Sequence, residues 1–378
     1  MRIGLNATCF NDRPSGARQR FVGIYGALIR ARPDWEFLIY EPADCAIARW
    51  FSDAPNVRAI ATPLRSTSRV QRSIRGFGYW RSRLKRDRLD LFEAFNLPLV
   101  RAKNIPFLLT IHDVRSALPA ELWLGRSISR AIHKHALRQA DLVITVSETM
   151  KQELLKLEQA STVLAIYNGI DPEPFADNRG EGGTIGDNLP DRYILAVGHL
   201  EPRKNYARLV EALSILRRDF SDLALVIVGN DGGARDALLA EIARHRLGDA
   251  VRLLLDISDD QLKAIYRQSR AVVFPSTYEG FGIPVLEAMA AQRPLILSDI
   301  PVFAELTEGQ GATFNPLDAG AIARAIAEVL ASPARQQALI SYGDRRVRDF
   351  GFDHLAGQVE SAYRQALASW RLSTESLS

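Results

Sequence analysis

Short apolar runs alternate with helical patterns along the whole chain. Twelve runs rich in Val, Ile, Leu and Phe are candidate strands, at residues 2–7, 35–41, 57–62, 89–95, 106–113, 141–147, 162–168, 193–198, 223–229, 251–256, 271–276 and 294–299. The segments between them show helical spacing, as in residues 205–218, where Leu209, Leu213 and Leu216 fall on one face. Because continuous apolar strands alternating with helices are typical of parallel sheets covered on both faces, the pattern predicts an α/β fold.

The alternation pauses once, over residues 171–192. This stretch is rich in Gly, Pro, Asp and Asn and has no periodic apolar face, so it is predicted to be a linker. The chain has 378 residues, more than one domain usually holds. We therefore predict two doubly wound, Rossmann-like domains facing each other across a cleft, an N-terminal domain at 1–176 and a C-terminal domain at 177–352.

Composition adds three expectations. The start of the chain lacks a long apolar segment, and no apolar run is long enough to cross a bilayer, so a cytoplasmic protein is predicted. Two cysteines, Cys9 and Cys45, suit a reducing compartment rather than a disulfide framework. The net charge of +4 suits anionic partners without choosing among them.

Residues 271–299 carry the strongest candidate chemistry. They are predicted to form a strand, a loop at 279–283, a helix starting at Pro284 and a second strand. A helix start after two glycines, Gly280 and Gly282, suits a nucleotide diphosphate. In such a loop Glu279 would accept hydrogen bonds from sugar hydroxyls and Glu287 would hold a ribose diol. The alternative is structural, with glycines that make a turn and a glutamate that complements the helix dipole.

The segment E-G-F-G-I-P-V-L-E-A-M-A, residues 279–290, resembles the donor signature of glycosyltransferase family 4, whose members are retaining enzymes of the GT-B fold. The resemblance implies that Glu279 contacts the transferred sugar and Glu287 the ribose. It also implies that the loop of Gly280, Phe281, Gly282 and Ile283 meets the sugar and phosphates. In this fold the last helix, here 353–378, is expected to pack back on the N-terminal domain.

A second segment, residues 193–213, is predicted to form a strand, a loop and a helix. Arg203 and Lys204 lie just before the helix, where their charges suit a diphosphate leaving group, although a solvated surface pair is the structural alternative. The run V-G-H-L-E-P-R-K-N is similar to the phosphate-binding segment of the family. Many members have Arg where this chain has His199, so Arg203 is expected to supply that charge. This variant resembles bacterial mannosyltransferases, which implies GDP-mannose as the first candidate donor, with UDP- and dTDP-sugars left open.

Two residues of the first half are candidates by the same resemblance. Gly16 follows the first strand and is implied to lie near the donor phosphates, although a lone glycine equally suits any turn. His112, followed by Asp113 at the end of a buried strand, is implied to lie near the anomeric carbon. A structural pair or a phosphohydrolase metal site is the alternative, but no further ligand cluster is evident in the sequence. His112 and Glu279 are the predicted catalytic residues.

The implied reaction is transfer with retention. A donor phosphate oxygen takes the acceptor proton, and the protein supplies positioning and positive charge. No metal or other cofactor is expected. The implied acceptor is a glycan or a lipid-linked glycan, in polysaccharide or lipopolysaccharide biosynthesis. A sugar-nucleotide epimerase or phosphorylase and a non-catalytic nucleotide-sugar-binding module remain alternatives. The module would keep the donor residues and would not need His112.

Residues 65–88 form a basic segment with nine Lys or Arg and one acid, Asp87. Apolar residues recur at helical spacing at Val70, Ile74, Phe77, Trp80 and Leu84. Two interpretations stay open: the stripe packs on the sheet, or the helix contacts an anionic membrane from the inner face. Nucleic acid is not expected, because no recognition motif accompanies the patch.

Overall fold

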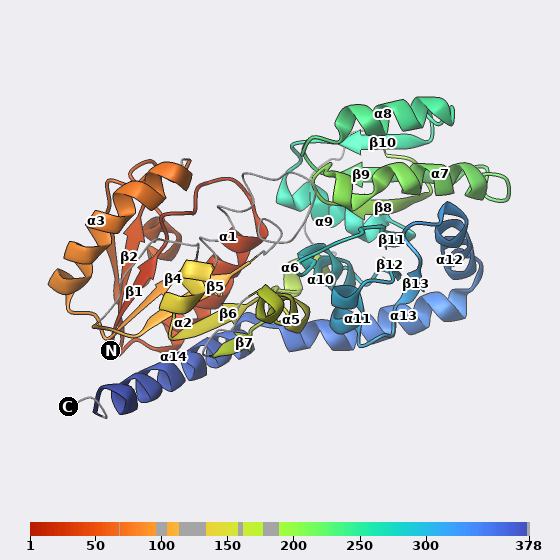
Figure 1. Ribbon diagram of the computed structural model, residues 1–378. Helices are drawn as coiled ribbons and strands as arrows, with labels where there is room; N and C mark the ends of the chain where they lie inside the picture. The colour runs from red at the N-terminus through yellow and green to blue at the C-terminus, as the bar shows by residue number, and fades with distance from the viewer. Residues whose placement is uncertain (68, 96–103, 113–133, 158–161, 177–188, 376–378) are drawn as a thin grey trace. The chain divides into compact units, whose positions relative to one another are not determined.

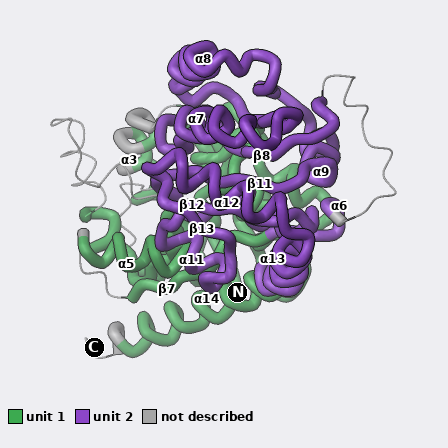
Figure 2. The backbone as a smooth tube through the Cα atoms, turned by 90° about the vertical axis from the view of Figure 1, so that its right-hand side faces the viewer, with its two compact units in different colours: residues 1–169, 352–378 green, residues 170–351 purple. Residues whose placement is uncertain are grey.

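The computed structural model describes residues 1–67, 69–95, 104–112, 134–157, 162–176 and 189–375, without the side chains of 69–71, 73, 74, 77 and 373–375. The chain divides into two compact units (Figure 2). Unit 1 comprises residues 1–169 and 352–378, and unit 2 comprises residues 170–351. Asp113 and part of the predicted linker, 177–188, lie outside the described residues.

Unit 1 begins with strand β1 and ends with a long C-terminal helix (Figure 1). Its strands are β1 (Arg2–Asn6), β2 (Glu36–Glu41), β3 (Val57–Ala61), β4 (Leu91–Ala94), β5 (Phe107–Ile111), β6 (Leu142–Thr145) and β7 (Val163–Ala165). Its helices are α1 (Gly16–Arg20), the π-helix η1 (Phe21–Tyr25), α2 (Gly26–Ala31), η2 (Ala48–Phe51), α3 (Arg69–Asp87), α5 (Glu148–Leu157) and α14 (Phe352–Glu375).

The sheet of unit 1 is parallel throughout, in the order β3-β2-β1-β4-β5-β6-β7. Three of its strands, β4, β5 and β6, are buried over their whole length, which explains their near-continuous apolar sequences. Helix α14 belongs to this unit, since Leu355, Val359 and Tyr363 are all in the core cluster that also holds Ile3 and Leu5 of β1.

Unit 2 repeats the same plan. Its strands are β8 (Tyr193–Val197), β9 (Ala224–Val228), β10 (Val251–Leu254), β11 (Ala271–Phe274), β12 (Leu295–Ser298) and β13 (Ala312–Phe314). Its helices are α6 (Glu173–Ala176), η4 (Pro202–Lys204), α7 (Tyr206–Leu216), α8 (Arg235–Arg244), α9 (Asp259–Gln268), α10 (Ile283–Ala290), α11 (Pro301–Thr307), α12 (Ala319–Ala331), α13 (Pro333–Arg346) and η5 (Val347–Phe350).

The strand order of unit 2 is β10-β9-β8-β11-β12-β13, again parallel. Its first strand, β8, therefore lies beside its fourth, β11, and the order reverses between them. In open α/β sheets, ligands bind at such a switch point, beyond the carboxyl ends of the strands. The loops that follow β8 and β11 are those that contain Arg203, Lys204 and Glu279.

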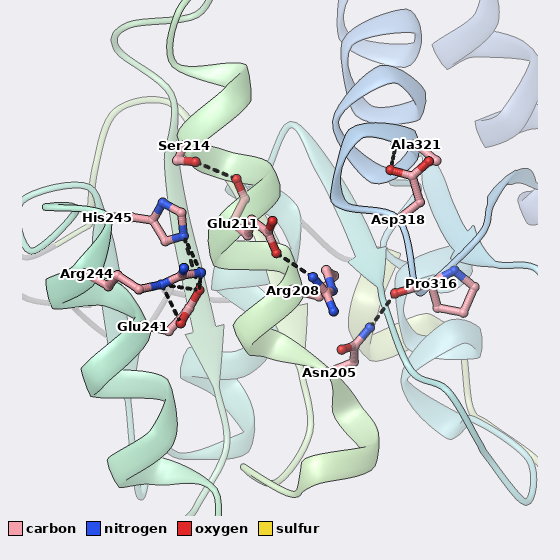
Figure 3. A network of polar contacts seen from close by, with 10 residues as sticks. All are labelled: Asn205, Arg208, Glu211, Ser214, Glu241, Arg244, His245, Pro316, Asp318 and Ala321. Atoms are coloured by element: carbon pink, nitrogen blue, oxygen red, sulfur yellow. Dashed lines mark hydrogen bonds and ion pairs between the residues drawn. The ribbon is translucent and has the colours of Figure 1, made fainter.

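Polar contacts on one side of unit 2 join its helices and loops (Figure 3). Asn205, at the start of α7, donates to the carbonyl of Pro316 at 2.8 Å, which ties the loop after β8 to the loop after β13. Asp318 caps α12 by accepting from the Ala321 amide at 3.0 Å. Asn205 has φ +58°, a left-handed conformation that asparagine tolerates, so η4 can turn directly into α7.

The boundary between the units differs from the predicted one. Unit 2 begins at Ile170 and not at residue 177, because Ile170 forms a backbone bridge with Gly351 and Phe175 packs on Tyr266 with ring centroids 6.0 Å apart. Part of the predicted linker is therefore the short helix α6 of unit 2. At the other end the boundary falls at 351/352, one residue from the predicted position.

The basic segment contains helix α3, which packs on the sheet of unit 1 through the described part of its apolar stripe. Trp80 is 1% exposed, and its ring lies 5.2 Å from those of Tyr40 and Phe92. Leu84 is buried too. The side chains of Val70, Ile74 and Phe77 lie outside the described ones. Trp80 and Leu84 are therefore buried in unit 1 and are not available to insert into a bilayer.

No helix within the described part of the chain combines the length and apolarity that crossing a bilayer requires.

Candidate functional site

Three of the predicted donor residues of unit 2, Arg203, Lys204 and Glu279, meet where β8 and β11 end. Glu279 lies at the centre of the group, with its side chain 8% exposed. One of its oxygens is 2.7 Å from Nζ of Lys204 and also accepts from the Ser276 hydroxyl at 2.8 Å. The other accepts from Nη1 of Arg203 at 2.5 Å. Two segments that are over seventy residues apart in sequence therefore form one cluster of charges.

This cluster fixes the ionisation of Glu279. Burial alone would raise the pKa of the carboxyl, but the charges of Lys204 and Arg203 outweigh it, so that pKa lies below its usual value. Without a ligand, each of the two cations is thus held by a carboxylate. A diphosphate would offer these two cations charge of the same sign and the same kind of oxygen acceptor.

Lys204 depends on a glycine for its place. Gly198, directly after β8, has φ +142°, and a Cβ there would lie 2.8 Å from both Cε and Nζ of Lys204. Tyr206 encloses the same space, since its hydroxyl donates to the Gly198 carbonyl at 3.1 Å. A side chain at position 198 would push the ammonium group away from Glu279.

Helix α10 starts in the predicted loop. Its N-cap, Gly282, has φ +107°, a left-handed conformation that favours glycine, and Ile283 and Pro284 form the first helical positions. Phe281 is buried, with its ring centroid 6.2 Å from that of Phe350. Gly280 precedes it in the loop. The helix begins at Ile283 rather than Pro284, so Glu287 is its fifth residue and not part of the first turn.

Glu287 is partly buried, and Tyr266 of α9 donates a hydrogen bond to its Oε2 at 2.9 Å. Burial raises the pKa of Glu287 to about 7, although the bond from Tyr266 and the charge of Lys204 act in the opposite direction. Glu287 can therefore exchange its proton near neutral pH.

Three residues of this site were not predicted. Glu201 accepts a hydrogen bond from Nε of Arg203 at 2.6 Å. The hydroxyl of Ser276 donates to Glu279, and the hydroxyl of Tyr266 donates to Glu287. Glu201 and Ser276 flank the predicted residues and could have been found from that proximity. Tyr266 could not, because a tyrosine on the apolar face of a helix looks like any core residue. His199 is exposed.

The candidates of unit 1 lie at the carboxyl edge of its sheet. Gly16 is the exposed first residue of α1, whose N-cap, Ser15, accepts from the Arg18 amide at 3.2 Å. His112 directly follows β5. Burial, and then the charge of Arg20, lowers the pKa of His112 to about 3, so its imidazole is neutral at physiological pH. Its Nε2 is buried and has no hydrogen-bond partner within the described residues.

Comparison with known proteins agrees with this geometry. The family model described as Glycosyltransferase Family 4 matches residues 30–174, and the model described as Glycosyl transferases group 1 matches residues 184–346. An uncharacterized glycosyltransferase of Methanocaldococcus jannaschii is 30% identical over 281 residues, which is 70% of each chain. The chain belongs to glycosyltransferase family 4. It is thus a glycosyltransferase, as the 279–290 segment predicted.

Named relatives of this family 4 glycosyltransferase differ in their activities. The O-antigen chain mannosyltransferase RfbU of Salmonella typhimurium is 29% identical over 265 residues, covering 70% of this chain and 69% of that protein. A glycogen synthase of Mycobacterium tuberculosis is 31% identical over 280 residues, covering 71% of this chain and 66% of that protein. Membership of the family therefore does not identify the sugar.

Solved structures share the fold. Sucrose-phosphate synthase from Thermosynechococcus elongatus matches with a TM-score of 0.78 at 23% identity, covering 97% of this chain and 99% of that chain. Anabaena Alr3699/HepE, in complex with UDP and glucose, matches with a TM-score of 0.71 at 18% identity, covering 96% and 98%. Together with the two parallel sheets, these matches confirm the predicted GT-B fold for this family 4 glycosyltransferase.

Proposed function

We propose that this glycosyltransferase transfers a hexose, with mannose from GDP-mannose as the first candidate, from a nucleotide sugar to a glycan or lipid-linked acceptor with retention of configuration. The observation that carries the proposal is the cluster of Glu279 with Lys204 and Arg203. It combines a carboxylate for sugar hydroxyls with two cations for a diphosphate, at the switch point of a parallel sheet. The relatives that are O-antigen mannosyltransferases support mannose and a role in polysaccharide biosynthesis.

In the proposed reaction, Glu279 binds the transferred sugar, Glu287 binds the ribose, and the loop from Gly280 to Ile283 faces the phosphates. Arg203 and Lys204 stabilise the negative charge that develops on the leaving diphosphate. In this proposal, their two positive charges take the place of a metal ion. For the residues of unit 1, the proposed roles are a backbone contact of Gly16 with the donor phosphates and a neutral imidazole of His112 near the reacting carbon. A donor phosphate oxygen accepts the proton of the attacking hydroxyl.

The test is a panel of nucleotide sugars presented to the purified protein. We expect saturable binding of one class, with GDP-mannose tried first, and turnover in the presence of lipid-linked glycan acceptors and EDTA. Glu279→Ala and His112→Ala should both remove turnover. If no nucleotide sugar binds, the proposal fails. Binding without turnover for every acceptor would favour the nucleotide-sugar-binding module, and release of an epimerised donor would favour the epimerase.

We also propose that α3 brings the enzyme to the inner face of an anionic membrane, where a lipid-linked acceptor would lie. Its apolar residues Trp80 and Leu84 are buried, so the contact is electrostatic and not an insertion. Support comes from a face with exposed basic residues, which are Arg75, Arg81, Lys85, Arg86 and Arg88. Each basic residue near an anionic surface contributes about 1 kcal/mol to binding.

Co-sedimentation with phosphatidylglycerol vesicles tests the membrane proposal. We expect the protein to sediment with these vesicles but not with neutral ones, and the triple variant Arg81→Gln, Lys85→Gln, Arg86→Gln to stay in solution. The matched control removes three exposed arginines of unit 2, Arg218, Arg235 and Arg345, by the same substitution. Equal loss of sedimentation in both triple variants would show a general charge effect and contradict a role for α3.

A further inference from the structure

Arg20 is a buried arginine whose guanidinium group is only partly hydrogen-bonded. It ends α1, directly before the π-helix η1, and is 1% exposed. Its Nη1 donates to the carbonyl oxygen of Ile166 at 2.8 Å and to that of Tyr167, just beyond β7. Its Nε and Nη2 are buried and have no hydrogen-bond partner in the described part of the chain. Two donor nitrogens of a permanent cation thus lack an acceptor among the residues that the structure describes.

Glu93, an acid in the same core, does not supply that acceptor. Its carboxylate already accepts from the hydroxyls of Tyr25 at 2.6 Å and Thr110 at 2.5 Å, and from that of Tyr363. The charge of Glu93 acts on Arg20 through space, but none of the ion pairs formed by the described residues includes Arg20. A buried cation without a close anion is costly, so an acceptor that carries negative charge would stabilise Arg20.

His112 adds a second unmatched polar group in the same part of unit 1. Ile111 pairs with Thr145, and Thr145 pairs with Ala165, so His112 and Ile166 follow their strands at the same level of the sheet. They are two strand spacings apart, about 10 Å. Arg20 is anchored to Ile166, and the charge of Arg20 contributes to the low pKa of His112. Like Nε and Nη2 of Arg20, the Nε2 atom of His112 is buried and has no hydrogen-bond partner among the described side chains and backbone.

We propose that Arg20, together with His112, binds a phosphate group at the carboxyl edge of the sheet of unit 1. The Nε–H and Nη2–H of a guanidinium form a planar fork that phosphate oxygens accept in pairs. A neutral imidazole can donate to the same group through Nε2. The edge beyond the carboxyl ends of the strands is where ligands bind in such sheets, and π-helices frequently occur at functional sites.

Two kinds of ligand carry such a phosphate group. One is the nucleotide-sugar donor, through its diphosphate, and the other is an acceptor that carries a phosphate. The site consists of residues of unit 1 alone and does not use Arg203 or Lys204. Its existence can therefore be tested separately from the proposed donor site in unit 2.

The test observes the Nε–H group of Arg20 by nitrogen-15 NMR in the full chain carrying Arg203→Met and Lys204→Met, which removes the cations of unit 2. The Arg20 signal is identified as the one missing from the Arg20→Lys variant, whose remaining spectrum shows that it folds. We expect inorganic phosphate to shift this signal saturably, and Arg20→Lys to weaken phosphate binding about tenfold or more. The signal of Arg217, which also donates to a backbone carbonyl, is the control and should not move.

A signal of Arg20 that does not respond to phosphate overturns the proposal, as does a response equal to that of Arg217. A second arm, with Arg203 and Lys204 intact, separates the sources. If GDP or UDP shifts the Arg20 signal and displaces phosphate, the site binds the donor diphosphate. If phosphate still shifts the signal at saturating nucleoside diphosphate, the site binds an acceptor phosphate. Failure of both nucleotides to bind would contradict the proposed donor site and leave the phosphate result standing.

Discussion

The hydroxyl of Tyr266 donates a hydrogen bond to Oε2 of Glu287 at 2.9 Å. Both residues belong to unit 2, but they lie on different helices, α9 and α10, so the bond sets the position of the carboxylate relative to the loop before α10. Tyr266 does not need to touch the donor to influence how it is held.

The first prediction follows from that bond. Tyr266→Phe removes a donor to the carboxylate, so the pKa of Glu287 should rise further and the KM for the donor should increase about tenfold, with kcat nearly unchanged. The pH at which donor binding is half-maximal should move upward. Tyr193→Phe is the matched control, because Tyr193 is an equally buried tyrosine whose hydroxyl donates to the Ile265 carbonyl at 2.7 Å. Identical pH profiles for both variants would show that Tyr266 is merely structural.

The second prediction concerns the ionisation of Glu287. Its pKa rises from 4.5 to about 7 in the folded protein, so folding favours the protonated form. This stabilisation is complete below about pH 4.5 and is lost as the pH rises to about 7, an effect on the order of 3 kcal/mol. Glu287→Gln should therefore raise the Tm without ligand at about pH 8 but hardly at about pH 5. The same variant should bind the donor more weakly. An equal change in Tm at both pH values would contradict the raised pKa.

The third prediction concerns the charge cluster. Glu279→Gln leaves Lys204 and Arg203 without their shared anion and should lower the free energy of unfolding by about 3–5 kcal/mol, measured by urea denaturation. Saturating GDP or UDP should recover part of the loss, because a diphosphate supplies new acceptors. Glu201→Gln removes the other carboxylate that binds Arg203. Because Glu201 is more exposed than Glu279, this substitution should lower the free energy of unfolding by less than Glu279→Gln does. A nucleotide that stabilises the Glu279 variant no more than the wild type would argue against a diphosphate at these cations.

The fourth prediction concerns the C-terminal helix. Tyr363 of α14 donates to Glu93, which lies on β4, so Tyr363→Phe leaves this buried carboxylate with one donor fewer. The free energy of unfolding of unit 1 should fall by about 1–3 kcal/mol. Tyr342→Phe is the control, since its hydroxyl bonds Glu308 at the surface at 3.1 Å and should cost little. Equal effects of the two substitutions in urea denaturation would rule out a special role for the buried bond.

Most of the fold could be predicted because parallel strands buried on both faces leave continuous apolar runs. All twelve predicted strands are present as β1–β12. Strand β13 was missed, since Ala312–Phe314 has three residues, of which the middle one is exposed. Such a short run does not differ from a loop in sequence.

The donor residues could be predicted because they lie in two short segments with recognisable spacing. The bond between Arg203 and Glu279 could not, because it depends on β8 and β11 being neighbours, and chain order does not give strand order. Arg20 was missed for a different reason. An arginine between Gln19 and Phe21 in a helical stretch looks like a surface residue, and only the folded unit shows that it is buried.

The apolar stripe of the basic segment did not predict, from its sequence alone, which surface the helix packs against. A helical period fits both a helix on a sheet and a helix on a bilayer, because each offers one apolar face. Trp80 decides the question at its own position, since Tyr40 and Phe92 surround its ring.

The chain passes from unit 1 to unit 2 and back at two neighbouring points. Ile170 and Gly351, the first and last residues of unit 2, form a backbone bridge, and the amide of Ile170 donates to the Phe350 carbonyl at 3.0 Å. Unit 2 is therefore an inserted domain whose ends meet, which is the condition under which domain insertion and circular permutation are tolerated. The module that holds Glu279 and Glu287 can thus be exchanged between relatives as one continuous cassette, and a single proteolytic cut would not separate it from unit 1.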